Sequence, residues 1–98
     1  MKFRLAPSAI SEVEAILQHL MEESPAGATA VAARLDQVFR AIESFPDAGR
    51  RTGRKSMRCR NTHPYPYLIF YKTSSSLTEI VSVRHGARNP RSMPARPR

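Results

Sequence analysis

Two stretches with helical spacing separate a short alternating segment from a β-rich second half. Residues 2–6 (KFRLA) alternate between charged and apolar side chains, which predicts a half-buried strand. Apolar residues then recur every three or four positions, which predicts two amphipathic helices. The first helical face comprises Ile10, Val13, Ile16, Leu17, Leu20 and Met21, and the second comprises Ala28, Val31, Ala32, Leu35, Val38, Phe39, Ile42 and Phe45. Only Ser24 and Pro25 interrupt the two runs, so we expect an antiparallel helical hairpin.

Side chains suited to helix ends mark the boundaries of this hairpin. Ser8 is a candidate cap for the first helix, and Ser11 with Glu14 offers a second capping box just inside it. Ser24 is placed to cap the second helix. Pro46 disfavours helical geometry at the residue before it, so we expect the second helix to end there.

The second half of the chain predicts a sheet. A strand beginning near residue 57 leads to a proline-rich corner, and two β-rich runs follow at residues 67–71 (YLIFY) and 77–83. The polar residues 72–76 have the length of a turn. Residues 67–71 lack a polar alternation, so both faces of that strand should be covered. The predicted fold is therefore α+β, in the order β-α-α-β-β-β, with the hairpin on one face of a mostly antiparallel small sheet.

The length of 98 residues suits one domain with a single modest core. We assign residues 1–90 to this domain. Residues 91–98 form a basic tail rich in proline and arginine that we expect to be disordered. Residues 50–55 (RRTGRK) are expected to form an exposed basic loop.

Positive charge is concentrated in the second half. Residues 1–49 hold four basic and seven acidic residues, for a net charge of −3, whereas residues 50–98 hold twelve basic residues and one acid, for +11. This asymmetry indicates a polyanionic or acidic partner, with an ordinary soluble basic domain as the alternative. The lone Cys59 and the lack of a long apolar run predict a cytoplasmic protein without a disulfide or a membrane span. The three histidines and the cysteine lack metal-ligand spacing, so we expect no metal and no cofactor.

Four arginines frame the predicted sheet. Arg58 and Arg60 lie two residues apart and share one strand face, where they form a cationic stripe or simply solvate the surface. Arg84 and Arg88 follow the last strand, where they are candidates to join that stripe in binding a target. His85 is a weak candidate for acid–base catalysis, because a lone histidine is more often structural.

Aromatic residues of the central strand allow two interpretations. Tyr65, Tyr67 and Tyr71 fall on one strand face by alternation, where they either stack on bases or pack under the helices. We favour core packing.

Three motifs in register around the hairpin resemble the RelE/ParE toxin superfamily. They are residues 45–50 (FPDAGR), 64–71 (PYPYLIFY) and 83–90 (VRHGARNP), and the last is most similar to the ParE branch. The resemblance implies the toxin of a type II toxin–antitoxin pair. It also implies a ParD-like antitoxin as partner and DNA gyrase as the target, without RNA cleavage. A ribosome-dependent mRNA endonuclease of the RelE type and a non-toxic basic interaction module are the alternatives.

The residues expected of a RelE-type nuclease are incomplete. Such enzymes place an arginine at the position of Leu68 and commonly a tyrosine near the C-terminus, whereas no tyrosine follows Tyr71 here. The resemblance therefore favours a toxin that is not itself an enzyme.

The resemblance also suggests how the antitoxin docks. An acidic and apolar segment would wrap from the hairpin onto a sheet edge. Leu17, Leu20, Leu35 and Phe39 are the candidate contacts, although the same side chains would suit a buried core.

Overall fold

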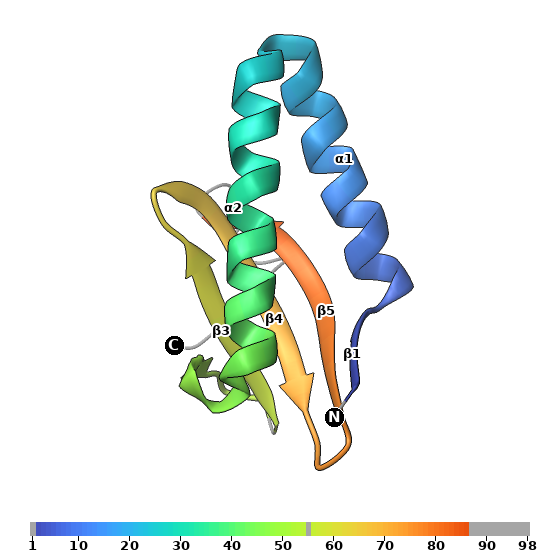
Figure 1. Ribbon diagram of the computed structural model, residues 1–98, viewed down its shortest axis with the longest axis vertical. Helices are drawn as coiled ribbons and strands as arrows, with labels where there is room; N and C mark the ends of the chain where they lie inside the picture. Colours follow the sequence, from blue (N-terminus) through green and yellow to red (C-terminus); the bar gives the residue numbers. More distant parts are fainter. Residues whose placement is uncertain (1, 55, 87–98) are drawn as a thin grey trace.

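The computed structural model describes residues 2–54 and 56–86. Its elements are β1 (Lys2–Leu5), α1 (Pro7–Glu23), α2 (Pro25–Ser44), the 3₁₀ helix η1 (Pro46–Ala48), β2 (Arg50–Arg51), β3 (Met57–Thr62), β4 (Tyr65–Thr73) and β5 (Leu77–His85). The two helices form a hairpin over one face of a single sheet (Figure 1). The predicted α+β class is confirmed. Arg88 and the predicted tail at residues 91–98 lie outside the described residues.

In the part of the chain that the structure describes, the sheet has five strands in the order β1-β5-β4-β3-β2. Neighbouring strands are antiparallel except β1, which runs parallel to β5 with Leu5 opposite Ile80. The last strand of the described residues therefore lies inside the sheet. Strand β2 was not predicted, because Arg50 and Arg51 carry no apolar pattern. Their backbone pairs with that of Cys59 and Arg58, respectively. The expected basic loop is therefore partly a strand.

Of the two predicted helix caps, one is present in the structure and the other is not. The prediction that Ser8 caps α1 was wrong, because α1 begins at Pro7 and its N-cap is Ala6, which offers no side-chain oxygen. Proline suits this first helical position, because the N–H that it lacks would have no partner within the helix. The Ser24 cap is confirmed, since its hydroxyl accepts the Gly27 N–H at 3.1 Å. Helix α2 ends at Ser44, before the non-helical Phe45 (φ −135°, ψ 69°).

Strand β4 is covered on both faces, as its sequence predicted. Tyr67, Ile69 and Tyr71 pack against the hairpin in the main core, so the core interpretation of these two tyrosines is confirmed. Phe70 faces the opposite side, where it packs with Met57 and Cys59 in a second cluster. The main core also contains the buried residues of the helices and of β5, namely Ala9, Val31, Leu35, Val38, Ile42, Ile80 and Val83.

The tip of the hairpin extends past the end of the sheet (Figure 1). No helix within residues 2–54 and 56–86 is both long and apolar enough to cross a membrane.

Candidate interaction surfaces

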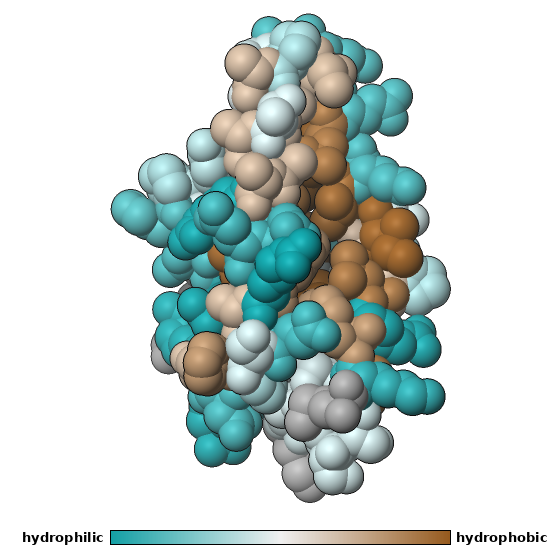
Figure 2. All heavy atoms as spheres, viewed as in Figure 1, coloured by the Kyte–Doolittle hydropathy of each residue, from teal (hydrophilic) through white to brown (hydrophobic). Residues whose placement is uncertain are grey.

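An apolar stripe follows one side of α1. We use the term α1 stripe for Ile10, Val13, Leu17 and Met21, whose spacing of three and four residues puts them on one helical face. Ile10 is 44% exposed and Met21 is 54% exposed, which is unusual for large apolar side chains. Figure 2 shows apolar atoms gathered along the groove between the two helices. The α1 stripe is therefore a surface available to an apolar partner.

The four predicted antitoxin contacts do not share one surface. Leu17 lies on the α1 stripe, while Leu20 lines a groove near the hairpin tip and Phe39 is half-buried against the core. Leu35 is only 2% exposed and needs correction, because its side chain belongs to the core and offers a partner almost no area. Ile10 and Met21 were not among the contacts predicted from the sequence.

His85 lines the groove beneath the hairpin tip. This groove has a volume of about 330 Å³ and also contains His19, Leu20 and Glu23. The His85 ring meets the Tyr67 ring edge-on with centroids 5.5 Å apart. The His19 Nε2 lies 3.2 Å from the Glu23 carboxylate one turn later. His85 is thus part of an aromatic contact at the end of β4.

Arg58 is held rigidly on the hairpin side of the sheet. Its Nη1 donates to the Gly49 carbonyl at 2.9 Å, and its Nη2 lies 3.8 Å from an Asp47 carboxylate oxygen. Cross-strand pairing puts Arg58 beside Tyr71 and Arg60 beside Ile69, both of which are core residues facing the hairpin. The predicted common face of Arg58 and Arg60 is therefore confirmed.

Arg84 lies on the other face of the sheet. It pairs with Leu68, which packs in the second cluster with Phe70. Its Nε donates to the Ser82 hydroxyl at 2.8 Å, and its Nη2 lies 3.7 Å from Glu12. The structure therefore does not bring Arg84 into one stripe with the β3 arginines.

Side chains of α1 occupy the outer edge of β5. Strand β1 pairs with β5 only as far as Ile80, and no other strand within residues 2–54 and 56–86 pairs with the following backbone on that side. The Ser8 hydroxyl donates to the Val81 carbonyl at 2.9 Å, and the Glu12 carboxylate accepts from the Val83 N–H at 2.9 Å. A strand added here would have to displace Glu12.

The Tyr71 hydroxyl joins the end of α2 to the sheet. It accepts from the Gly49 N–H at 3.0 Å and donates to the Pro46 carbonyl at 2.8 Å. Burial raises the pKa of the Tyr71 phenol above its usual 10.0, while the Gly49 hydrogen bond and the charges of Arg58 and Arg60 oppose that rise. Burial likewise raises the pKa of the Cys59 thiol, against the nearby Arg50 charge.

Tyr71→Phe should lower the free energy of unfolding by about 1–3 kcal/mol, because it leaves the buried Gly49 N–H without its acceptor. A folded-state pKa above the unfolded value of about 10 stabilises the protein fully below that pH, and this contribution is lost as pH rises further. Urea unfolding at neutral and strongly alkaline pH should therefore show a smaller alkaline loss in Tyr71→Phe. An equal loss in both proteins would exclude Tyr71 as its source.

Gly49 is a matched position for the same network, because a Cβ there would fall on the Tyr71 hydroxyl. Gly49→Ala should displace the tyrosine and destabilise the fold, and its effect should shrink in a Tyr71→Phe background. Additive effects of the two substitutions would contradict a direct contact.

Leu68 is the residue that the family resemblance places where RelE-type nucleases carry an arginine. Its side chain is packed closely against Gly86, where an added Cβ would lie 3.0 Å from Leu68 Cγ.

Among the described residues, no three histidine, cysteine or acidic side chains gather closely enough to hold a metal ion.

Known proteins resemble the chain over most of its length. The family described as ParE toxin of type II toxin-antitoxin system, parDE, matches residues 3–90. The chain belongs to the ParE toxin family. A curated relative, Toxin RelE2 of Caulobacter vibrioides, is 31% identical over 80 residues, which span 82% of this chain and 89% of that protein. This membership confirms the predicted RelE/ParE superfamily and supports an antitoxin as partner.

A solved ParE-family complex shares the fold. The structure titled Chromosomal ParDE TA system from P. aeruginosa matches with a TM-score of 0.78 at 15% identity, covering 87% of this chain and 95% of that one. The helical spacing of Ile10 and Met21 is the sequence pattern from which the α1 stripe could have been predicted.

Proposed function

We propose that this toxin inhibits DNA gyrase and is held inactive by a ParD-like antitoxin. The ParE family match supports the gyrase branch of the superfamily over the RNA-cleaving branch. The observation that carries the proposal is the separation of the candidate proton-transfer group, His85, from Arg58. Release of the toxin from its antitoxin would then arrest growth through loss of supercoiling.

RNA cleavage through a 2′-hydroxyl would need a base, an acid and cations around one phosphate. His85 pairs with Tyr67 at one end of β4, whereas Arg58 pairs with Tyr71 nearer the other end. Four residues along a strand span roughly 13 Å, and β3 and β5 are separated by another strand. His85 and Arg58 therefore project from opposite ends of β4, which supports target binding over RNA cleavage.

The antitoxin segment is proposed to dock as an amphipathic helix on the α1 stripe. Ile10 and Met21 supply exposed apolar area that a helix can bury, with Leu17 between them. The basic second half of the toxin suits an acidic continuation of the same partner. Hydrogen exchange with and without antitoxin should show protection in α1, and protection confined to residues after Asn89 would contradict this placement.

Two assays with purified components test the target. Gyrase supercoiling of relaxed plasmid should be inhibited by the toxin and restored by antitoxin, while primer extension on translated mRNA should show no new cuts. Codon-positioned cuts together with normal supercoiling would overturn the proposal in favour of a ribosome-dependent nuclease. If the toxin neither inhibited supercoiling nor cut mRNA, the chain would be a non-toxic interaction module.

His85→Ala should leave growth arrest almost unchanged, because His85 is not proposed to be a general acid–base catalyst. Loss of such a catalyst would instead lower activity by about 10²–10⁴-fold. Arg60→Ala should weaken target binding slightly, since exposed charge pairs contribute about 0.2–1 kcal/mol. Combining Arg60→Ala with Arg58→Ala, on the same face of β3, should weaken it further. Arg40→Ala is the matched control, because Arg40 is exposed on α2 and pairs with Asp36.

These variants are compared by dose–response of growth arrest and by inhibition of supercoiling, with antitoxin binding as the test of folding. If His85→Ala alone abolished arrest while the folded double arginine variant stayed toxic, the gyrase-binding mechanism would be replaced by the nuclease mechanism.

A further inference from the structure

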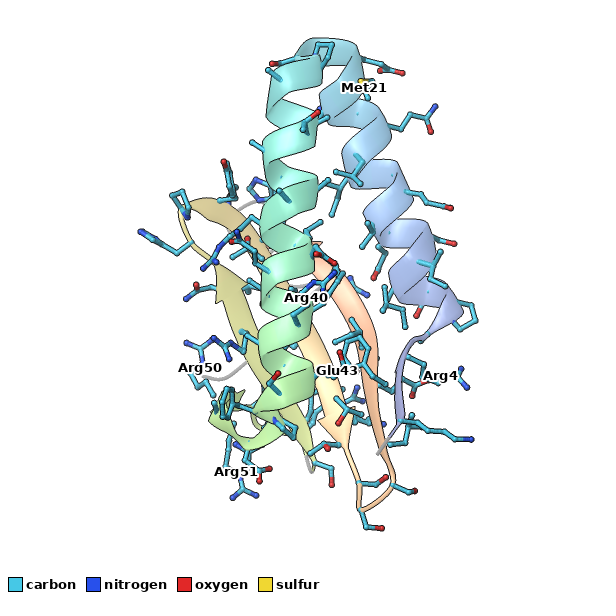
Figure 3. All side chains as sticks on the ribbon, in the orientation of Figure 1. Arg4, Met21, Arg40, Glu43, Arg50 and Arg51 are labelled. Carbon is cyan, nitrogen blue, oxygen red and sulfur yellow. The ribbon has the colours of Figure 1, made fainter. Side chains whose placement is uncertain are left out.

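A small polar pocket lies beside η1, where β2 and β3 meet the end of β4. Its volume is about 200 Å³, and its lining comprises Asp47, Arg51, Ser56, Met57, Arg58 and Thr73. Figure 3 shows Arg51 projecting from the β2 side of the molecule, far from Met21 at the hairpin tip. No aromatic side chain of the described residues lines this pocket. It is therefore suited to a small polar group.

Two positive charges face each other in the pocket. Arg51 and Arg58 are directly opposite in the antiparallel pair formed by β2 and β3. Like charges at opposite positions destabilise a sheet unless something neutralises them. The one acid in the lining is Asp47, whose side chain is 84% exposed and whose oxygen lies 3.8 Å from Arg58. This long, solvated contact leaves most of the positive charge uncompensated.

The Arg58 guanidinium is already positioned for a ligand. Its hydrogen bond to the Gly49 carbonyl fixes one side of the group, and Gly49 is held by the Tyr71 hydroxyl. Its side chain is 20% exposed, so it has lost much of its freedom without losing contact with solvent. Arg51 is exposed, and within residues 2–54 and 56–86 no ion pair joins it to an acid.

We propose that the Arg51–Arg58 pocket binds one phosphate of a nucleic-acid backbone. A planar guanidinium presents paired donors that match two phosphate oxygens, and two guanidinium groups on adjacent strands can hold one phosphate between them. Ser56 adds a hydroxyl to the lining, while the Thr73 hydroxyl already shares a 2.9 Å hydrogen bond with Thr78. Contacts to phosphate carry no sequence information, so the binding is independent of base sequence.

The surrounding charges favour a nucleic acid over an acidic peptide. Arg54 lies in the same basic segment as Arg51, and Arg60 follows Arg58 on the same face of β3, whereas Arg50 faces the other side beside Cys59. Such a row suits the regularly spaced phosphates of a polyanion. A peptide would normally add apolar contacts, whereas Met57 is the only apolar side chain of the pocket lining among the described residues.

The test uses the full chain, freed from antitoxin, and fluorescein-labelled DNA duplexes of two unrelated sequences, followed by fluorescence anisotropy. The two duplexes should bind alike. Arg51→Ala should weaken binding roughly tenfold and reduce the salt slope by about one. Arg51→Lys should recover only part of the affinity because it keeps the charge but loses the paired donors. Arg40→Ala is the matched control, since it removes an equal charge from the outer face of α2 (Figure 3).

Each other outcome has a defined meaning. An equal loss in Arg40→Ala, or no loss in Arg51→Ala, would overturn the pocket as the binding site. Binding of polyglutamate in place of either duplex, with the same dependence on Arg51, would overturn the nucleic acid in favour of an acidic protein. Single-stranded RNA in a parallel titration identifies which backbone is preferred. The anisotropy titration contains neither gyrase nor ribosomes, so its result does not depend on the outcome of the supercoiling assay.

Discussion

Replacing Ile10 and Met21 together with aspartate should weaken antitoxin binding by roughly a hundredfold. Complete burial of a large apolar side chain contributes about 1.5–3 kcal/mol, and both side chains are about half exposed in the free toxin. A helix docked on the α1 stripe would bury that remaining area, whereas two carboxylates would have to be desolvated there. Calorimetric titration with purified antitoxin measures the change, and cells that express both proteins should lose protection.

Ser11→Asp with Gln18→Asp is the matched control for this variant. Both positions are exposed on α1 but lie off the α1 stripe, so they add the same charge to a different face. The control should bind antitoxin almost normally. Equal weakening by both double variants would indicate a general charge effect, and unchanged binding by the Ile10 and Met21 variant would refute docking on the stripe.

Leu35→Ala should lower the free energy of unfolding by about 2–5 kcal/mol, because it opens a cavity in the main core. Leu35 is 2% exposed and packs among the buried residues of α2, β4 and β5. Small domains have few kcal/mol to spare, so this variant should be partly unfolded at moderate temperature. Urea denaturation followed by circular dichroism gives the value.

Leu17→Ala provides the comparison, since Leu17 is only partly buried and lies on the α1 stripe. It should destabilise the fold less than Leu35→Ala but weaken antitoxin binding more, at concentrations where both proteins are folded. If Leu35→Ala were as stable as Leu17→Ala, the assignment of Leu35 to the core would be wrong.

The sequence predicted the elements better than it predicted their surfaces. Helical spacing identified both helices, and the apolar run in β4 correctly indicated a strand covered on two faces. Spacing alone does not say how far each apolar residue is covered, so Leu17 and Leu35 looked equivalent. Only the packing of the hairpin on the sheet places Leu17 at the surface and Leu35 in the core.

The arginine prediction was limited by a detail of strand register. Alternation along β5 is interrupted at a bulge, because Tyr71 pairs with Ile80 whereas the adjacent Phe70 pairs with Ser82. The extra residue moves all later side chains by one position relative to β4. Arg84 therefore lies on the face opposite the β3 arginines, and no local pattern in the sequence reports such a shift.

Contacts between distant parts of the chain were also beyond local patterns. Ser8 has the composition of a helix cap, yet its hydroxyl bonds to Val81, and Glu12 of the same helix bonds to Val83. The Arg51–Arg58 pair likewise depends on the chain turning back to form β2.

The central position of β5 constrains how the toxin is made on the ribosome. Among the described residues, strand β5 comes last in the sequence, but it lies between β1 and β4. As the chain emerges, β1 has no partner and β4 lacks one neighbour until β5 has been synthesised. Such long-range pairing also slows folding. A product of an interrupted message that stops before Leu77 therefore contains the whole helical hairpin but no complete sheet, so premature termination yields no folded toxin.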